Sequence, residues 1–202
     1  MSGVPILLEG SALTVLVVGG GAVAVRKAAA FVAAGAAVRV VAREPSAAMR
    51  ELADAGGVAL TERAYARDDI GDAALVIAAT SDRATNAAVA DDARASSRLV
   101  NVADAPETGS FATMATHRAG GLVVGVSAGG VPGAAARVRD AIADRFDARY
   151  ATALAGLAAL RRSLLERGAS AEWRAISAEA FASDFCDAVE SGALDARVAA
   201  WR

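Results

Sequence analysis

Several residue types are scarce in this chain of 202 residues, and each scarcity excludes a class of structure. A single cysteine, Cys186, rules out a disulfide framework and any metal site built from a cysteine cluster. With one histidine, His117, no second imidazole can complete a metal set. Aromatic residues make up only 4%, so the core has to be built from Ala, Val and Leu. We therefore expect no bound metal ion and a core of small aliphatic side chains.

The chain also has no large excess of charge of one sign, because it contains 21 Lys+Arg and 23 Asp+Glu, for a net charge of −2. This balance gives no electrostatic footprint for nucleic acid. Hydrophobic residues make up 55%, which excludes a disordered chain, yet no apolar run reaches the roughly 18 residues that span a membrane. The N-terminus carries Glu9 and no basic residue before Arg26, unlike a secretory signal. We expect a soluble, cytoplasmic protein of one to two domains with no nucleic-acid or membrane partner.

Short, valine-rich apolar runs predict buried strands, and helical patterns separate them. The expected strands are Leu13–Val18, Val38–Ala42, Val58–Leu60, Leu75–Ala79, Leu99–Val102 and Leu122–Val126. The expected helices between them are Ala22–Ala34, Ser46–Ala55 and Ala84–Ala95. This alternation predicts an α/β protein with a doubly wound parallel sheet.

The character of the chain changes near Val131. From Pro132 to Arg202 there is no convincing strand, and amphipathic patterns predict helices at Ala134–Phe146, at Arg149–Arg167 and around Ala178–Val189. The sequence therefore predicts a nucleotide-binding domain of about 110 residues, a connecting segment and a small all-helical C-terminal domain.

A glycine loop joins the first predicted strand to the first helix. The segment Gly19–Ala24 fits the pattern G-x-G-x-x-A of Rossmann-type dinucleotide-binding domains. Gly19 permits the tight turn, Gly21 lets backbone approach a pyrophosphate, and the helix N-terminus faces the phosphates. A purely structural turn would also explain a glycine triplet, but the strand before it and the helix after it favour the cofactor. The candidate cofactor-binding residues in this loop are Gly19, Gly20, Gly21, Ala22 and Val23.

The end of the second predicted strand bears on the identity of the cofactor. Glu44 lies where an acidic residue hydrogen-bonds the ribose 2′-hydroxyl of NAD. Arg43 beside it could instead receive the 2′-phosphate of NADP, and we favour NAD. Thr80 and Ser81 end the fourth predicted strand, and we expect them to border the cofactor.

Several segments in order resemble the dehydrogenase/ferrochelatase family of siroheme synthase. They are Val17–Lys27, Ala34–Ala36, Ala78–Asp82 followed by Asn86, Asn101–Pro106, Ser110–Phe111 and Val126–Gly130. No segment resembles the uroporphyrinogen methyltransferase domain, so the resemblance is to the stand-alone form. It covers about residues 1–147, and the helical tail fits more loosely.

This resemblance implies a function and a domain layout. The family oxidises precorrin-2 to sirohydrochlorin with NAD⁺, and many members then insert Fe²⁺ to give siroheme. The implied layout is an NAD-binding Rossmann domain over residues 1–113, a dimerisation segment over 114–147 and a helical domain over 148–202, in a homodimer. A rival hypothesis from another class is a non-catalytic NAD-binding module that senses redox state, which would need the glycine loop but not Asp104.

Asp104 is the candidate catalytic residue, because it follows a strand at its carboxyl end and matches the family's catalytic aspartate. Oxidation of precorrin-2 releases a proton from the macrocycle, and metal insertion releases pyrrole N–H protons. A carboxylate near the ring could serve as general base in both steps. The alternative is that Asp104 is only the first residue of an Asp-x-Pro turn.

Other candidates follow from the family motifs. Asn101 could hydrogen-bond the cofactor or a macrocycle carboxylate, whereas for Asn86 local backbone bonding and function are both open. The candidate substrate-binding residues are Asn101, Ser127, Gly129 and Gly130. The chain departs from the family pattern at Ala128 and at Val131-Pro132-Gly133, which puts the ferrochelatase activity in question.

The remaining rare residues have plainer interpretations. Lys27, the only lysine, lies at the family's Arg-Lys position, although a solvated helix face with Arg26 would also explain it. We expect His117 at the surface or at a helix end, and Cys186 packed in an apolar helical context.

Overall fold

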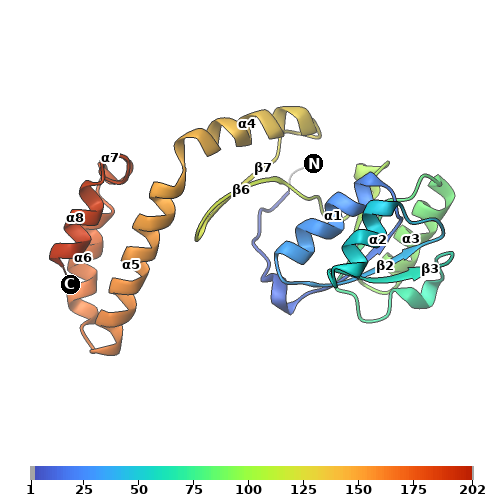
Figure 1. Cartoon of the computed structure of the whole chain (residues 1–202), viewed down its shortest axis with the longest axis horizontal. Helices are drawn as coiled ribbons and strands as arrows, with labels where there is room; N and C mark the ends of the chain where they lie inside the picture. The colour runs from blue at the N-terminus through green and yellow to red at the C-terminus, as the bar shows by residue number, and fades with distance from the viewer. Residues whose placement is uncertain (1–2, 202) are drawn as a thin grey trace. The chain divides into compact units, whose positions relative to one another are not determined.

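The computed structural model describes residues 3–201, and the chain divides into two compact units (Figure 1). The first unit is Met1–Thr113 and the second is Met114–Arg202. Each unit has hydrophobic clusters of its own.

The first unit contains a five-stranded sheet in which all neighbouring strands pair in parallel, in the order β3-β2-β1-β4-β5. The strands are β1 (Thr14–Val18), β2 (Ala37–Ala42), β3 (Ala59–Glu62), β4 (Leu75–Ala78) and β5 (Leu99–Val102). This order is that of a dinucleotide-binding sheet. The predicted Rossmann-type α/β fold is confirmed.

Helices cover both faces of this sheet (Figure 1). Helices α1 (Ala22–Ala33) and α2 (Ala47–Asp54) pack on one face, over a cluster that includes Val17, Val40 and Ile77. Helix α3 (Arg83–Ala95) packs on the other face, over Leu16 and Val76. Because side chains alternate along each strand, both faces need apolar residues, and this explains the nearly continuous valine runs.

The topology places the ligand-binding edge at the carboxyl ends of β1 and β4. These strands are neighbours, yet β1 continues into α1 on one face while β4 continues into α3 on the other. In open α/β sheets, the loops that diverge at such a point leave a crevice in which ligands bind.

Short 3₁₀ turns complete the unit at η1 (Gly10–Ala12), η2 (Arg67–Asp69) and η3 (Pro106–Thr108).

The second unit corrects one strand prediction. Leu122–Val126, expected as a sixth parallel strand, is β7, and it pairs antiparallel with β6 (Ala115–Ala119) in a separate two-stranded sheet. Gly120, with φ of +57°, begins the two-residue Gly-Gly turn between them. Two residues suffice for a hairpin but cannot form the crossover that parallel pairing requires. The partner strand β6 was not predicted, because its sequence is polar at Thr116, His117 and Arg118.

The rest of the second unit is helical. Its helices are α4 (Pro132–Arg145), α5 (Ala148–Glu166), α6 (Ser170–Ala180), α7 (Phe185–Ser191) and α8 (Ala193–Ala200). Helix α4 packs against the hairpin, and α5 packs against α6, α7 and α8 through clusters that include Leu157, Leu194 and Leu164. Among the helices within residues 3–201, none combines the length and the apolar character that crossing a membrane requires.

Candidate functional site

The glycine loop is tightly constrained at its first two residues. Gly19 has φ of +130°, and a Cβ added to it would lie 2.3 Å from the carbonyl oxygen of Ala79. A Cβ on Gly20 would lie 2.6 Å from the Cα of Pro45. Steric exclusion therefore requires glycine at both positions, whether or not a ligand is bound.

Gly21 differs, because no atom lies within 4 Å of the place where its Cβ would be. It is the N-cap of α1 and offers no side chain to bond the free N–H groups of the first turn. By contrast, Ser46 caps α2 and Asp82 caps α3. The start of α1 thus presents unbonded N–H donors to open space, which suits a pyrophosphate.

A cavity of about 540 Å³ opens at this loop, within the size range of small-molecule sites. It brings together most of the predicted cofactor-binding residues, which are Gly19, Gly20, Gly21, Arg43, Glu44, Thr80 and Ser81. Ala22 and Val23 do not line it and lie in the first turn of α1. Arg43 and Glu44 are both exposed, so both remain available to a ribose or a phosphate. The residues present therefore fit a dinucleotide.

Arg63, Tyr65 and Thr85 also line this cavity and were missed by the sequence analysis. Burial and a hydrogen bond to Asp92 raise the pKa of Tyr65 well above its ordinary value, so its hydroxyl stays neutral. Arg63 forms an ion pair with Asp69. No local pattern identifies Arg63 and Tyr65, since the segment after β3 matches no motif.

Asn86 lies in the first turns of α3 with its side chain fully buried, at 1% exposed. Its Oδ1 accepts a hydrogen bond from the backbone N–H of Thr80 at 3.0 Å and lies 2.8 Å from the Thr80 hydroxyl. Its Nδ2 donates to the Thr80 carbonyl at 3.1 Å and to Oδ1 of Asp104 at 2.8 Å. Of the two hypotheses for Asn86, the structure thus combines backbone bonding with a contact to the candidate base.

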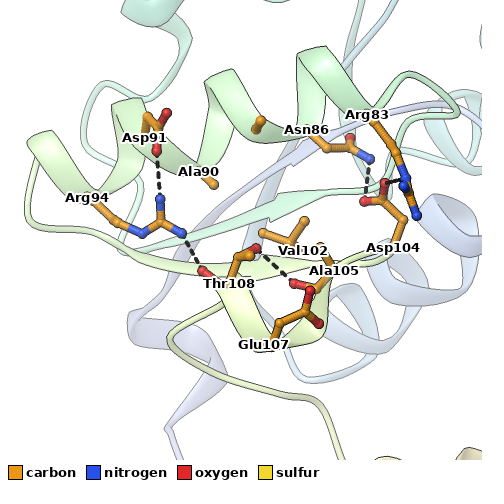
Figure 2. A pocket seen from close by; sticks show the side chains of 11 residues that line it. Arg83, Asn86, Ala90, Asp91, Arg94, Val102, Asp104, Ala105, Glu107 and Thr108 are labelled. Carbon is orange, nitrogen blue, oxygen red and sulfur yellow. Dashed lines mark hydrogen bonds and ion pairs between the residues drawn. The ribbon is translucent and has the colours of Figure 1, made fainter.

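Asp104 follows β5 and lines a second cavity, of about 330 Å³, between α3 and η3 (Figure 2). Its Oδ1 faces Asn86, while Oδ2 lies 3.5 Å from Nε of Arg83. The carboxylate is 31% exposed, so it is accessible to a reactant. Its side chain thus contacts Asn86 and Arg83, both of which lie outside the Asp104-Ala105-Pro106 segment.

The predicted substrate-binding residues are divided between the two units. Asn101, in β5, is 6% exposed; its Nδ2 donates to the Phe111 carbonyl at 2.9 Å, and its buried Oδ1 has no partner within residues 3–201. Ser127, Gly129 and Gly130 belong to the second unit, on the turn between β7 and α4. Asn101 lines neither cavity.

Lys27 is half-buried, and its Nζ donates to Oγ1 of Thr113 at 3.2 Å. Burial, together with nearby Arg26, lowers the pKa of its ammonium group. Of the two explanations for Lys27, a fully solvated face does not describe it, because its ammonium group contacts Thr113, the last residue of the first unit.

His117 lies half-buried in β6, and its ring reaches the C-terminal end of α4, where Phe146 is the C-cap residue. Its Nε2 lies 2.6 Å from the Phe146 carbonyl, which can only accept, so Nε2 carries the proton. Cys186 is a partly buried member of the apolar cluster around α5, α7 and α8. Within the part of the chain that the structure describes, no group of three or more His, Cys, Asp or Glu side chains could hold a metal ion.

Comparisons with known proteins agree with this geometry. Residues 6–115 match the family model described as "Putative NAD(P)-binding". The siroheme synthase of Methylococcus capsulatus is 42% identical over 168 residues, which are 83% of this chain and 35% of that protein. The siroheme synthase of Stutzerimonas stutzeri is 44% identical over 146 residues, 72% of this chain and 31% of that protein. The chain thus spans about a third of the length of the curated relatives it matches.

A solved structure, "SirC, precorrin-2 dehydrogenase", superimposes with a TM-score of 0.76 and 24% sequence identity. The match covers 98% of this chain and 99% of that chain. At this level of identity, the likeness establishes a shared fold.

Proposed function

The chain belongs to the NAD(P)-binding family whose model covers residues 6–115, with siroheme synthases among its relatives, and on this premise we propose that it oxidises precorrin-2 to sirohydrochlorin with NAD⁺. The observation that carries the proposal is the pairing of two features at one edge of the sheet. The glycine loop, with open space at Gly21, follows β1, and the accessible carboxylate of Asp104 follows β5. A redox-sensing module would need only the first of these features.

Asp104 is the proposed general base. Removing a hydride from precorrin-2 leaves a macrocycle that must also lose a proton, and a carboxylate within reach can accept it. Bound NAD⁺ supplies the hydride acceptor. The chain's own groups would bind and orient the cofactor. The N–H donors at the start of α1 would bind its pyrophosphate, and Glu44 would accept a hydrogen bond from the ribose 2′-hydroxyl.

The substrate carries eight carboxylates, and guanidinium groups match carboxylates geometrically. Of the 20 arginines, Arg83 is our candidate for one such contact, because its side chain is 86% exposed at the rim of the cavity that contains Asp104. Asn101, Ser127, Gly129 and Gly130 remain our further candidates for substrate contacts.

We extend the proposal to insertion of Fe²⁺ into sirohydrochlorin, with Asp104 accepting pyrrole protons, and to a homodimeric, cytoplasmic enzyme. The name of the relatives, siroheme synthase, supports the iron-insertion step. The departures at Ala128 and at Val131-Pro132-Gly133 are where this second activity would be lost.

The test is anaerobic incubation of the purified chain with precorrin-2 and NAD⁺, followed by NADH fluorescence and the absorption spectrum of sirohydrochlorin. We expect equal amounts of both products, and adding Fe²⁺ afterwards then reports on the second activity. A chain that binds NAD⁺ but leaves precorrin-2 unchanged would instead support the redox-sensing module.

A further inference from the structure

We infer that Asn86 is a positioning residue, which holds the Asp104 carboxylate in place for proton transfer (Figure 2). Asn86 also ties that carboxylate to Thr80, at the wall of the cofactor cavity. The inference rests on the proposed function of Asp104 as general base. It assigns a role to a side chain that lies between the two cavities, on the N-terminal part of α3.

The orientation of the Asn86 amide is fixed by the Thr80 backbone. Oδ1 receives the Thr80 N–H at 3.0 Å, and Nδ2 reaches the Thr80 carbonyl at 3.1 Å. A flipped amide would set its NH₂ against an N–H and its oxygen against a carbonyl, and both contacts would be repulsive. The second Nδ2 proton is therefore left to point at Oδ1 of Asp104.

Burial makes this arrangement rigid. Asn86 is only 1% exposed, and leaving a buried amide unpaired is costly. All donor and acceptor positions of the amide are used by Thr80 and Asp104. The carboxylate is thus held by one oxygen, while Oδ2 stays on the side of Arg83, at the cavity.

The residue type suits the role. A neutral amide donates a hydrogen bond to the carboxylate without neutralising it, so Asp104 is oriented and still able to accept a proton. Aspartate at position 86 has nearly the same shape but would oppose the Thr80 carbonyl and Asp104 with a second negative charge.

A spectroscopic test needs no turnover. The chain has no glutamine, and its only asparagines are Asn86 and Asn101, so the side-chain amide region of a ¹H–¹⁵N spectrum holds just two NH₂ pairs. We expect the Asn86 pair to have one proton displaced downfield by the carboxylate, and this displacement to vanish in Asp104→Ala. An unchanged Asn86 pair in Asp104→Ala would overturn the inference.

The kinetic test uses Asn86→Ala and Asn86→Asp with precorrin-2 and NAD⁺. We expect kcat to fall on the order of ten- to hundredfold, as misplaced catalytic groups do, while KM for NAD⁺ changes by less than about threefold. In the Asp104→Ala background, Asn86→Ala should cost almost nothing further, because the two residues act as one unit. Fully additive losses would overturn the inference.

Val89→Ala is the matched control, because Val89 is fully buried on the same helix and lines neither cavity. It should lower the stability of α3 and leave kcat near that of the wild type. A wild-type chain that never oxidises precorrin-2 overturns the proposed function and the role of Asn86 with it. A wild-type chain that turns over, beside an Asn86→Ala variant with unchanged kcat, overturns the positioning role alone.

Discussion

The backbone of Gly19 lies against the carbonyl of Ala79 so closely that a Cβ on Gly19 would sit 2.3 Å from that oxygen. This contact joins the turn after β1 to the end of β4. We expect Gly19→Ala to destabilise the first unit by more than about 2 kcal/mol, because a positive φ and a clash with backbone act together. Urea unfolding measures the loss, and a variant as stable as the wild type would contradict the close approach.

Gly21 provides the matched comparison, because its Cβ would meet open space. We expect Gly21→Ala to change stability by no more than about 0.5 kcal/mol, yet to weaken NAD⁺ binding at least tenfold by filling the place where the pyrophosphate approaches. Calorimetric titration with NAD⁺ tests this. Unaltered affinity would place the cofactor elsewhere.

Asp104→Ala should lower the rate of NADH production from precorrin-2 by on the order of 10²- to 10⁴-fold, the loss typical for removal of a general base. NAD⁺ affinity should stay within a few-fold, because Asp104 does not line the glycine-loop cavity. Turnover and NAD⁺ binding are measured on the same preparation. Undiminished turnover would refute the role of Asp104.

Glu44 should set the preference for NAD⁺ over NADP⁺. Glu44→Ala should weaken NAD⁺ binding, because the 2′-hydroxyl loses its acceptor, and should relieve repulsion of the 2′-phosphate beside Arg43. The expected change is on the order of tenfold in the ratio of the two affinities, which is about 1.4 kcal/mol. A wild-type chain that already prefers NADP⁺ would rule out this role.

Asp69 should make the stability of the first unit depend on acid pH. A fork of hydrogen bonds from Arg63, aided by the Ala66 N–H, holds the pKa of Asp69 below its ordinary 3.8. Since the folded pKa lies below the unfolded one, the stabilisation is complete above the unfolded value and is lost as pH falls toward the folded value.

Asp69→Asn should therefore lower the free energy of unfolding by about 1 to 3 kcal/mol at neutral pH, because the Asp69 side chain is only 9% exposed. In this variant, the free energy of unfolding should also depend less on pH in the acid range. Asp91→Asn is the control, since Asp91 is 78% exposed and pairs with Arg94 at the surface, and it should change little. Thermal melts between neutral and acid pH measure both. Equal losses in the two variants would contradict the assignment.

The parallel sheet was predictable from local sequence because its central strands, β1 and β4, are buried on both faces and therefore read as uninterrupted apolar runs. Val15–Val18 and Leu75–Ala78 are of this kind, and both are buried throughout. The hairpin of β6 and β7 was not predictable in the same way. Thr116 and Arg118 in β6 are exposed, so that strand carries a polar sequence that local patterns do not distinguish from a loop.

In the candidate site, too, some features follow from local sequence and others only from tertiary packing. The sequence by itself determined the glycine loop, the acidic residue after β2 and the aspartate after β5, because strand ends and backbone constraints are local properties that follow from residue type. Only the tertiary structure decided what surrounds them. It set Asn86 between Thr80 and Asp104, and it brought Tyr65 to the cofactor cavity. The contact of Asn86 with Asp104 and the place of Tyr65 join separate elements, and they arise from how helices and loops pack on the sheet, which no short stretch of sequence encodes.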